Sequence, residues 1–384
     1  MKIFIIKFAD LWLKGSNRNE FVNVLFANIK KAISEYKTNL EKKFDRFHLS
    51  ILDSIDEEKV ISILKFIPGI SLIVPTWLII NDIDEIKKTT ISILDKEIKT
   101  FKIEAKREKK DFPLSSYEIK TTIASAIINE LKYVVDVHKP TLTIDISIKL
   151  DCCYLSFLRY RGIGGLPIGI NGSTLSLISG GIDSAVSSFL MQNKGLEVHY
   201  LLFIENNDTS KLLIEKIRKI INLITLDNKI FTPKLFIVNF DSVQQELAHA
   251  RNKSYRINLM RRSFYRIAAQ IAILNHIDSL TSGDSLGQVA SQTLESLQTI
   301  SKATDMLIFR PLLGFEKNEI ILIARKINTY NISITQHNDI CSNFNPENPI
   351  TRPKIEFANS LENELPLLFD LEKSAIQNMK QIEV

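Results

Sequence analysis

The stretch TLSLISGGIDSAVSSFLMQ, residues 174–192, decides the fold of the carboxy-terminal half of this chain. The apolar residues within 174–178 predict a buried strand, and residues 184–192 predict a helix. SGGIDS, residues 179–184, joins the two directly. Two glycines let the backbone approach phosphate oxygens, the N–H groups at a helix start point toward an anion, and serine hydroxyls can donate hydrogen bonds. The junction therefore predicts a pyrophosphate-binding loop, since a simple tight turn would need only one glycine and no hydroxyls.

Strands and helices continue to alternate after this loop. Further strands are expected at 198–203, 235–240 and 306–309, and further helices at 211–224 and 258–275. This alternation predicts a doubly wound, mostly parallel α/β sheet that binds ligands at the carboxyl ends of its strands. Five glycines between 162 and 172 predict a linker before it.

The residues before this linker predict a mixed α+β architecture. Expected strands are 2–8, 46–52, 70–80, 101–105 and 142–148, and expected helices are 18–33, 56–66, 84–98 and 116–131. Short strands and amphipathic helices in this order predict two small α+β units.

Composition fits a folded protein of several domains. The chain has 384 residues, of which 45% are hydrophobic and 24% are charged, which excludes a disordered or collagen-like chain. Cysteine occurs only at 152, 153 and 341, too few for a disulfide scaffold, so a reducing, cytoplasmic location is expected. No secretory signal is expected, because Lys7 and Asp10 interrupt the apolar amino terminus and no small-residue cleavage site follows. No membrane span is expected, because the longest apolar run, 66–80, contains two prolines and a glycine and is shorter than the roughly 20 residues of a spanning helix.

The positive charge is concentrated at the amino terminus. The net charge is +5, and residues 1–50 contain ten Lys+Arg against five Asp+Glu. Charge alone favours a solvated helix face over a nucleic-acid contact surface, but a local concentration of basic residues is also what phosphate neutralisation needs.

The loop also indicates a reaction class. No G-x-x-x-x-G-K-[ST] motif occurs, so γ-phosphate transfer of the Walker type is not indicated. SGGxDS resembles the loop of the ATP-pyrophosphatases, which implies attack on the α-phosphate of ATP, release of pyrophosphate and an adenylated oxygen that a nucleophile displaces. The charge that develops would be stabilised by the loop, Mg²⁺ and an arginine.

Further motifs along the chain extend this resemblance. They are KGxNR at 14–18, KREKKDFP at 106–113, GIGGLP at 162–167, MRR at 260–262, RIA at 266–268, GDSLGQVASQTLESL at 283–297, RPL at 310–312, INTY at 327–330 and DIC at 339–341. Together they resemble the tRNA 4-thiouridine synthetase family, also called tRNA uracil 4-sulfurtransferases, over nearly the whole chain.

The resemblance implies three domains and a linker. A ferredoxin-like domain is expected at 1–54, a THUMP RNA-binding domain at 55–161, the linker at 162–173 and a PP-loop adenylating domain at 174–384. It further implies that ATP activates O4 of uridine 8 in tRNA and that a persulfide sulfur replaces this oxygen, giving 4-thiouridine. A cysteine desulfurase is the implied sulfur donor, and a homodimer and a link to thiamine synthesis are possible.

Matching motif positions give the expected site residues. For ATP they are Leu177, Ile178, Ser179, Gly180, Gly181, Asp183, Ser184, Leu202, Phe203, Arg261, Gly283 and Gln292. From the sequence alone, Arg262 is as good a phosphate ligand as Arg261. The expected catalytic residues are Cys341, whose thiolate would carry the persulfide, and Asp183. Basic residues expected to bind tRNA are Lys14, Arg18, Lys106, Arg107, Lys109 and Lys110, and no metal site made by protein side chains is expected.

Three features depart from the family pattern. Ala185 stands where relatives often have proline, and Ile340 stands where short relatives often have a second cysteine. No rhodanese-like extension follows the PP-loop domain, so direct loading of the persulfide on Cys341 is expected.

Two other functions remain open at this stage. One is a small-molecule adenylating ligase or amidotransferase, similar to GMP or NAD synthetases, which would need no cysteine near its end. The other is a non-catalytic RNA-binding protein, which would have no use for an intact SGGIDS loop.

Overall fold

The structure is a computed structural model, and it describes residues 1–9, 15–97, 99–205, 210–335, 346 and 348–384. The contacts divide the chain into two compact units. The amino-terminal unit comprises Met1–Arg18 and Ala32–Gly165, and the carboxy-terminal unit comprises Asn19–Lys31 and Leu166–Val384. No helix within the described ranges is long and apolar enough to cross a bilayer.

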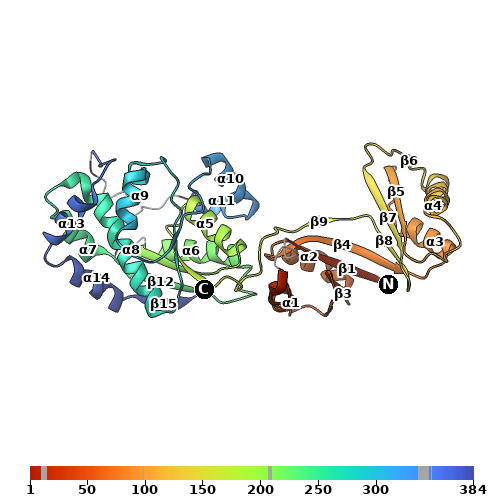
Figure 1. The fold of residues 1–384 in the computed structure, drawn as a ribbon, viewed down its shortest axis with the longest axis horizontal. Coiled ribbons are helices and arrows are strands. Elements are labelled where there is room, and N and C mark those ends of the chain that lie inside the picture. Colours follow the sequence, from red (N-terminus) through yellow and green to blue (C-terminus); the bar gives the residue numbers. More distant parts are fainter. Residues whose placement is uncertain (10–14, 98, 206–209, 336–345, 347) are drawn as a thin grey trace. The chain divides into compact units, whose positions relative to one another are not determined.

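One mixed sheet organises the amino-terminal unit (Figure 1). Its strands are β1 (Lys2–Phe8), β2 (Thr38–Lys42), β3 (Arg46–Ile51), β4 (Ile70–Ile79), β5 (Thr100–Arg107), β6 (Val134–Val135), β7 (Leu142–Ile148), β8 (Cys153–Ser156) and β9 (Tyr160–Arg161). They lie in the order β2-β3-β1-β4-β8-β7-β5-β6, with β9 paired to β4. The long strand β4 links both halves, because it pairs with β1 and, at Trp77, with Leu155 of β8.

Helices cover each half of this sheet. They are α2 (Glu57–Lys65), α3 (Ile83–Ile93) and α4 (Ser116–Leu131), with a 3₁₀ turn, η2 (Ser54–Asp56), before α2. Helix α1 (Arg18–Ala32) falls almost wholly in the segment that belongs to the carboxy-terminal unit. Helix α4 begins with a capping box between Ser115 and Glu118, which satisfies two amides that the helix start leaves free. Its isoleucines at 119, 123 and 127 are fully buried against β5 and β7, so the helical spacing of apolar residues fixes how α4 packs.

A mostly parallel sheet forms the centre of the carboxy-terminal unit. The strands are β10 (Ser173–Leu177), β11 (Glu197–Ile204), β12 (Lys234–Asn239), β13 (Leu280–Thr281), β14 (Ile308–Phe309) and β15 (Lys380–Glu383). Their order is β14-β13-β10-β11-β12-β15, and only β15 is antiparallel to its neighbour. The order reverses at β10, which places the following loop at the switch point where such sheets bind ligands.

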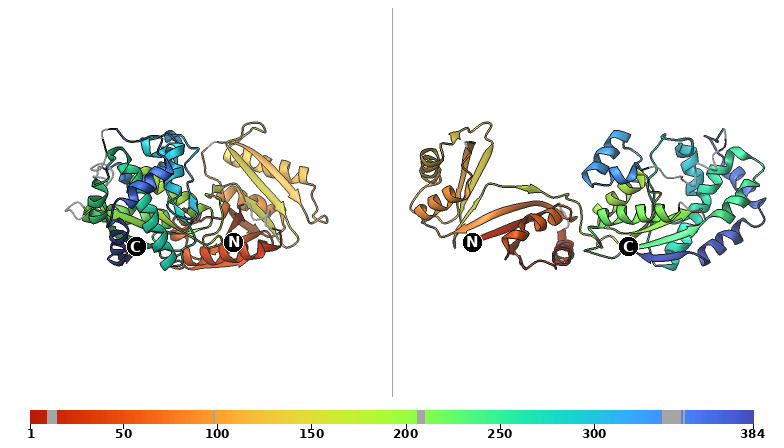
Figure 2. Two further views of the ribbon diagram at one scale, coloured as in Figure 1. Left: turned by 60° about the vertical axis from the view of Figure 1, so that its left-hand side comes forward. Right: turned by 180° about the vertical axis from the view of Figure 1, so that it is seen from behind.

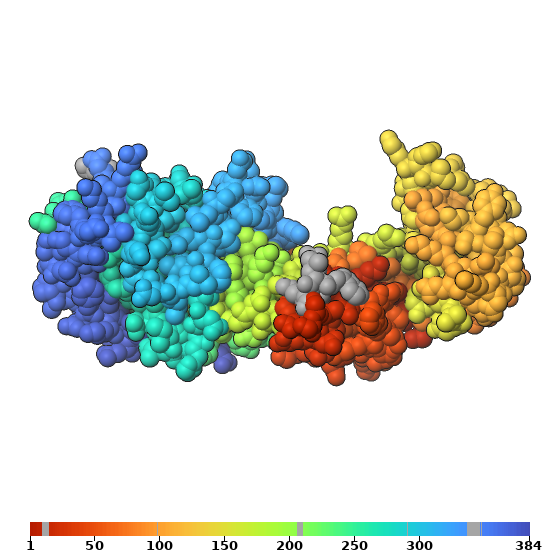
Figure 3. All heavy atoms as spheres, in the orientation of Figure 1, coloured from red at the N-terminus to blue at the C-terminus, as the bar shows by residue number. Residues whose placement is uncertain are grey.

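Two groups of helices cover the two faces of this sheet (Figure 2). One group contains α5 (Ile182–Asn193), α6 (Ser210–Thr225), α10 (Lys317–Lys326) and α11 (Tyr330–Ser333). The other contains α7 (Asp241–Ala248), α8 (Arg256–Leu274), α9 (Leu294–Ser301), α13 (Ile355–Asn363) and α14 (Leu368–Gln377). Helices α9 and α10, light blue in Figure 3, reach the surface, where Leu294 and Leu322 are exposed. The predicted doubly wound fold is confirmed for this unit.

Helix α8 is the most deeply buried helix of its group. Its residues Leu259, Met260, Tyr265 and Ile267 are fully buried in the core that α8 forms with β10, β11 and β12. The crossover from β12 through α7 and α8 returns the chain to β13, which is parallel to β10. The first turn of α8 therefore lies at the carboxyl edge of the sheet, where the loop after β10 also lies.

Candidate active site

The predicted pyrophosphate loop joins β10, which ends at Leu177, to α5, which begins at Ile182. Gly181 is the N-cap residue of α5, and no side chain caps the amides of the first turn. The Ser184 hydroxyl instead donates to the Gly181 carbonyl at 3.1 Å and accepts from the Ser179 amide at 3.3 Å. The loop thus holds its own shape, and it leaves helix-start N–H groups for an anion.

Two glycines are required by close packing around the loop. Gly180 has φ +79°, and a Cβ there would lie 3.3 to 3.6 Å from Leu213, Lys216 and Ile217 of α6. A Cβ on Gly283, just after β13, would lie 2.9 Å from the backbone nitrogen of Ser184. The structure therefore brings the predicted residue Gly283 directly against the loop, although 100 residues of sequence separate them.

Asp183 faces two side chains from distant parts of the chain. Its Oδ1 accepts a hydrogen bond at 2.6 Å from Nζ of Lys317, the first residue of α10. Its Oδ2 accepts a hydrogen bond at 3.1 Å from Nε2 of Gln288. The side chain of Lys317 remains 46% exposed, so its ammonium can reach a ligand that binds at the loop. Sequence analysis missed Lys317, which has no motif signal, whereas Gln288 lies in the quoted run at 283–297.

The carboxylate of Asp284 holds Arg261. Asp284 is fully buried, and its Oδ1 accepts from Arg261 at 2.5 Å while its Oδ2 accepts from Arg310 at 3.2 Å and Ser282 at 2.8 Å. Burial alone would raise the pKa of Asp284, but Arg261, the Ser282 hydroxyl and Arg310 outweigh it and lower the pKa to about 2. Asp284 is therefore an anion at neutral pH, and it holds two arginines beside Gly283.

Arg262 has a different environment from Arg261. Its guanidinium is buried and donates to both carboxylate oxygens of Glu362 at 2.8 Å, to the Thr299 carbonyl at 2.6 Å and to Asn359 at 2.6 Å. Every nitrogen of this side chain is thus bound within the protein. The geometry favours Arg261 over Arg262 as the residue that can face phosphate.

The residues predicted to hold adenine lie at the ends of neighbouring strands. Leu177 of β10 pairs with Leu201 of β11, and the Ile178 amide donates to the Leu201 carbonyl at 2.9 Å. Leu177 and Ile178 therefore lie beside Leu202 and Phe203 at the carboxyl edge. Phe203 stacks on Phe264 of α8 with a centroid distance of 4.1 Å.

Gln292 lies in a short 3₁₀ turn, η4 (Ala290–Gln292). Its carbonyl accepts from the Gly287 amide at 2.9 Å, and its Oε1 atom is buried with no hydrogen-bond partner among the described residues. A buried unpaired amide oxygen costs about 1–3 kcal/mol. A ligand group that donated to this oxygen would remove that cost.

The predicted tRNA-binding residues have varied environments. Arg18 donates to the Phe44 carbonyl at 2.5 Å, and Arg107 donates to the carbonyls of Phe112 and Leu114, both at 2.9 Å. Lys106 and Lys110 are exposed and Lys109 is half-buried. Arg107 therefore shapes its own loop, which leaves the three lysines as the residues there that could reach phosphates.

Two of the predicted residues, Cys341 and Lys14, lie outside the described residues. Among the residues that are described, no group of three or more His, Cys, Asp or Glu side chains could hold a metal ion. Cys153 is buried, and burial raises the pKa of its thiol to about 12, so it stays protonated at neutral pH.

Family models match three parts of the chain. The model of the ThiI ferredoxin-like domain matches residues 3–73, that of the THUMP domain matches 81–158, and that of the thiamine biosynthesis protein ThiI matches 169–367. The predicted boundary after residue 54 falls within the first of these matches.

Full-length relatives agree with these matches. A probable tRNA sulfurtransferase of Malacoplasma penetrans is 51% identical and one of Mycoplasmopsis agalactiae is 40% identical, and the matches cover 98% and 97% of both chains. Among solved structures, a 4-thiouridine synthetase crystallised in an RNA complex with bound ATP superposes with a TM-score of 0.90 at 31% identity over 100% of both chains. PH1313 from Pyrococcus horikoshii, at 20% identity and a TM-score of 0.64, shares the fold. This chain therefore belongs to the ThiI family of tRNA sulfurtransferases.

Proposed function

We propose that this protein transfers sulfur to uridine 8 of tRNA in an ATP-dependent reaction and so forms 4-thiouridine. The observation that carries the proposal is the intact phosphate loop with Gly283 packed against it, in a chain related over its whole length to tRNA sulfurtransferases. Neither of the other two functions that the sequence left open is favoured by a feature of the structure.

ATP would bind along the carboxyl edge of the parallel sheet. Its phosphates would accept hydrogen bonds from the first turn of α5, with Lys317 and Arg261 as the nearby cations. Its adenine would lie against the backbone of 177–178 and 202–203, and Gln292 Oε1 would accept a hydrogen bond from the nucleotide.

The first chemical step is adenylation. O4 of the uracil attacks the α-phosphorus of ATP, the bond from that phosphorus to the bridging oxygen breaks, and pyrophosphate leaves. Negative charge grows on the pyrophosphate as this bond breaks. Donors that are already aimed at these oxygens stabilise the transition state without reorganisation, which is the role we assign to the loop amides and Lys317.

The second step is sulfur transfer from Cys341. The terminal sulfur of its persulfide attacks C4 of the base, the C4–O bond breaks and AMP leaves, which joins the base to Cys341 through a disulfide. The transferred sulfur is still two electrons more oxidised than the thione of the product. Two thiol groups of a reductant must therefore supply these two electrons: the first displaces 4-thiouridine and forms a mixed disulfide with Cys341, and the second resolves it, so that Cys341 returns as a thiol and the reductant leaves as a disulfide.

Mg²⁺ fits this site only through the nucleotide. Asp183 is the carboxylate that lies in the loop, and the described residues offer no cluster of three ligands, whereas Mg²⁺ is often held by one carboxylate together with substrate phosphates. When bound, the ion would neutralise phosphate charge. Asp183 itself would orient Lys317 and Gln288.

The remaining assignments follow from the family resemblance. The basic residues 14, 18, 106, 109 and 110 would contact tRNA phosphates, a cysteine desulfurase would load Cys341, and the protein would act in the cytoplasm as a homodimer. The domain limits 1–54, 55–161, 162–173 and 174–384 stay predictions.

The proposal is tested with purified protein, unmodified tRNA, ATP and a persulfide donor. We expect 4-thiouridine in the nucleoside digest and pyrophosphate release that depends on tRNA. Pyrophosphate release that responds to a small acid and ignores tRNA would instead support a small-molecule ligase, and absence of ATP binding would support a non-catalytic RNA-binding protein.

A further inference from the structure

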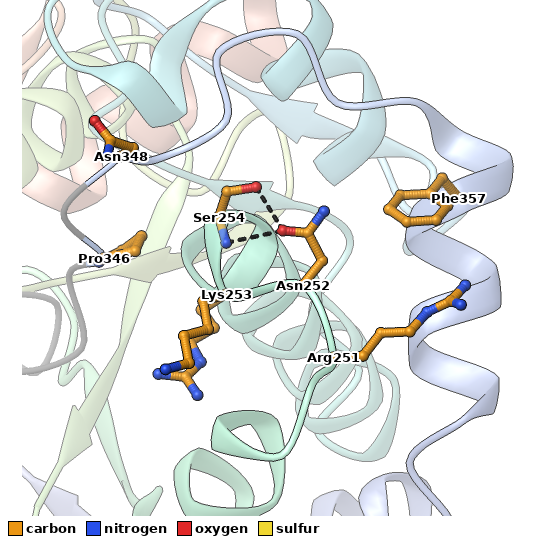
Figure 4. A pocket seen from close by; sticks show the side chains of 8 residues that line it. Arg251, Asn252, Lys253, Ser254, Pro346, Asn348 and Phe357 are labelled. Carbon is orange, nitrogen blue, oxygen red and sulfur yellow. Dashed lines mark hydrogen bonds between the residues drawn. The ribbon is translucent and has the colours of Figure 1, made fainter.

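A cavity of about 760 Å³ opens beside the first turn of α8 (Figure 4). Three cationic side chains line it, those of Arg251, Lys253 and Arg256, and none of the described residues that line it is acidic. Lys253 belongs to a 3₁₀ turn, η3 (Lys253–Tyr255), in which Asn252 Oδ1 accepts from the amide and hydroxyl of Ser254 at 3.1 and 2.7 Å. The backbone that carries these cations is therefore held in place.

The cavity is separate from the predicted ATP site. None of the residues expected to bind ATP lines it. The two sites nevertheless share α8, because Arg256 and Arg261 are five residues apart, which is about 7.5 Å along a helix axis. Both sites lie at the carboxyl edge of the sheet, so a large substrate can occupy them together.

The three cationic side chains differ in the hydrogen bonds and ion pairs that they make within the protein. Arg251 Nε pairs with Glu364 at 3.0 Å in an exposed ion pair, and Arg256 donates to the Ala248 carbonyl. The ammonium group of Lys253 has no hydrogen bond or ion pair with any part of the chain that the structure describes. The ammonium group of Lys253 is therefore available to bind an anion from outside the chain.

We propose that this cavity binds backbone phosphates of the substrate RNA next to the target uridine, an inference that rests on the proposed function. Concentrated cations bind polyanions by displacing condensed counterions, and the start of α8 adds the positive end of a helix dipole. Phosphate contacts of this kind fix the position of an RNA without reading its sequence.

The chain itself connects the cavity with the expected sulfur carrier. Pro346 lines the cavity, and Cys341 precedes it by five residues. The expected sulfur carrier is therefore close in sequence to a residue that lines the cavity.

The test measures binding of labelled, unmodified tRNA to the full-length protein over a range of salt concentrations, with no ATP and no sulfur donor. We expect Lys253→Ala to weaken binding about sixfold at ~0.1 M salt and to lower the salt slope by roughly one unit, the effect of one lost phosphate contact. Lys253→Arg should bind like the unchanged protein. Lys219→Ala, which removes an exposed lysine in the middle of α6, is the matched control.

The same preparations separate this inference from the proposed function. If Lys253→Ala matches Lys219→Ala in affinity and salt slope, the cavity does not bind RNA, whether or not the unchanged protein forms 4-thiouridine. A Lys253→Ala protein that binds tRNA normally but accepts sulfur poorly from a desulfurase would assign the cavity to that protein partner and overturn the inference. If the unchanged protein forms no 4-thiouridine, the proposed function fails, and so does the assignment of this RNA as substrate.

Discussion

The Cβ position of Gly283 lies 2.9 Å from the backbone nitrogen of Ser184, closer than real Cβ atoms come to other atoms. Both neighbours at that distance are backbone atoms of the phosphate loop, so no side-chain rotation can relieve the contact. A methyl group at position 283 must therefore displace the start of α5, where we propose that the phosphates of ATP bind. This one contact couples the end of β13 to the catalytic loop.

We predict that Gly283→Ala lowers tRNA-dependent pyrophosphate release at least tenfold, because the loop amides would no longer aim at the phosphates. Overpacking of this kind costs about 1–3 kcal/mol, so the protein should remain folded with a lower melting temperature. Gly314→Ala is the control, since a Cβ at Gly314 has no neighbour within 4 Å. Equal activities of the two variants would show that the loop tolerates displacement.

Removal of the Lys317 ammonium should impair ATP use without unfolding the protein. The pair between Lys317 and Asp183 is partly exposed, and such pairs contribute about 0–1 kcal/mol to stability. We expect Lys317→Ala to raise the KM for ATP and to lower kcat, with a melting temperature within a few degrees of the unchanged protein. Lys326→Ala, at the exposed end of the same helix, should leave all three values unchanged.

Some parts of this site can be predicted from sequence because their determinants are local. The loop 179–184 is an example, since its glycines, hydroxyls, preceding strand and following helix are contiguous. Lys317 cannot be found this way, because it meets Asp183 only through the tertiary fold. Arg310 lies in the quoted motif at 310–312, but its contact with Asp284 likewise arises only in the tertiary fold. The sequence-based prediction also lacked β2 and β15, whose polar residues show no strand pattern and which form by pairing with β3 and β12.

The sequence also cannot distinguish the roles of the two adjacent arginines of α8, Arg261 and Arg262. A helix turns by about 100° per residue, so neighbouring side chains face different surroundings. Arg261 faces Asp284 beside the loop, whereas Arg262 faces Glu362 in the core. The two arginines are distinguished by contacts that arise in the tertiary fold, with Asp284 on one side and with α9 and α13 on the other.

Lysine substitutions should separate the roles of these arginines. Arg262→Lys keeps a positive charge but cannot make the two-pronged contact with buried Glu362, so we expect a lower melting temperature with an almost unchanged KM for ATP. Arg261→Lys should chiefly raise the KM for ATP. Differential scanning calorimetry and ATP titration measure the two effects, and the reverse pattern would assign phosphate binding to Arg262.

Asp284 should make stability depend on acid pH. Its folded-state pKa of about 2 lies below the ordinary value of 3.8, so the unfolded chain binds the proton more tightly. The stability that its carboxylate contributes is therefore fully present above about pH 4 and is lost as the pH falls toward 2. Urea unfolding should show that Asp284→Asn is much less stable than the unchanged protein at pH 7 and that the difference shrinks below pH 4. A difference that is constant with pH would contradict this.

Replacement of each cysteine in turn tests the assignment of the sulfur carrier. We expect Cys341→Ser to abolish 4-thiouridine formation while ATP and tRNA still bind, because a hydroxyl cannot carry persulfide sulfur. Cys153→Ala should keep full activity, because burial raises the pKa of the Cys153 thiol to about 12 and so suppresses its thiolate. Cys152→Ser should also keep full activity, because burial raises the pKa of the Cys152 thiol as well. Trapping of sulfur-35 on the protein after incubation with a desulfurase and labelled cysteine provides a direct readout. Label that remains on Cys341→Ser and disappears from Cys152→Ser would transfer the role to Cys152.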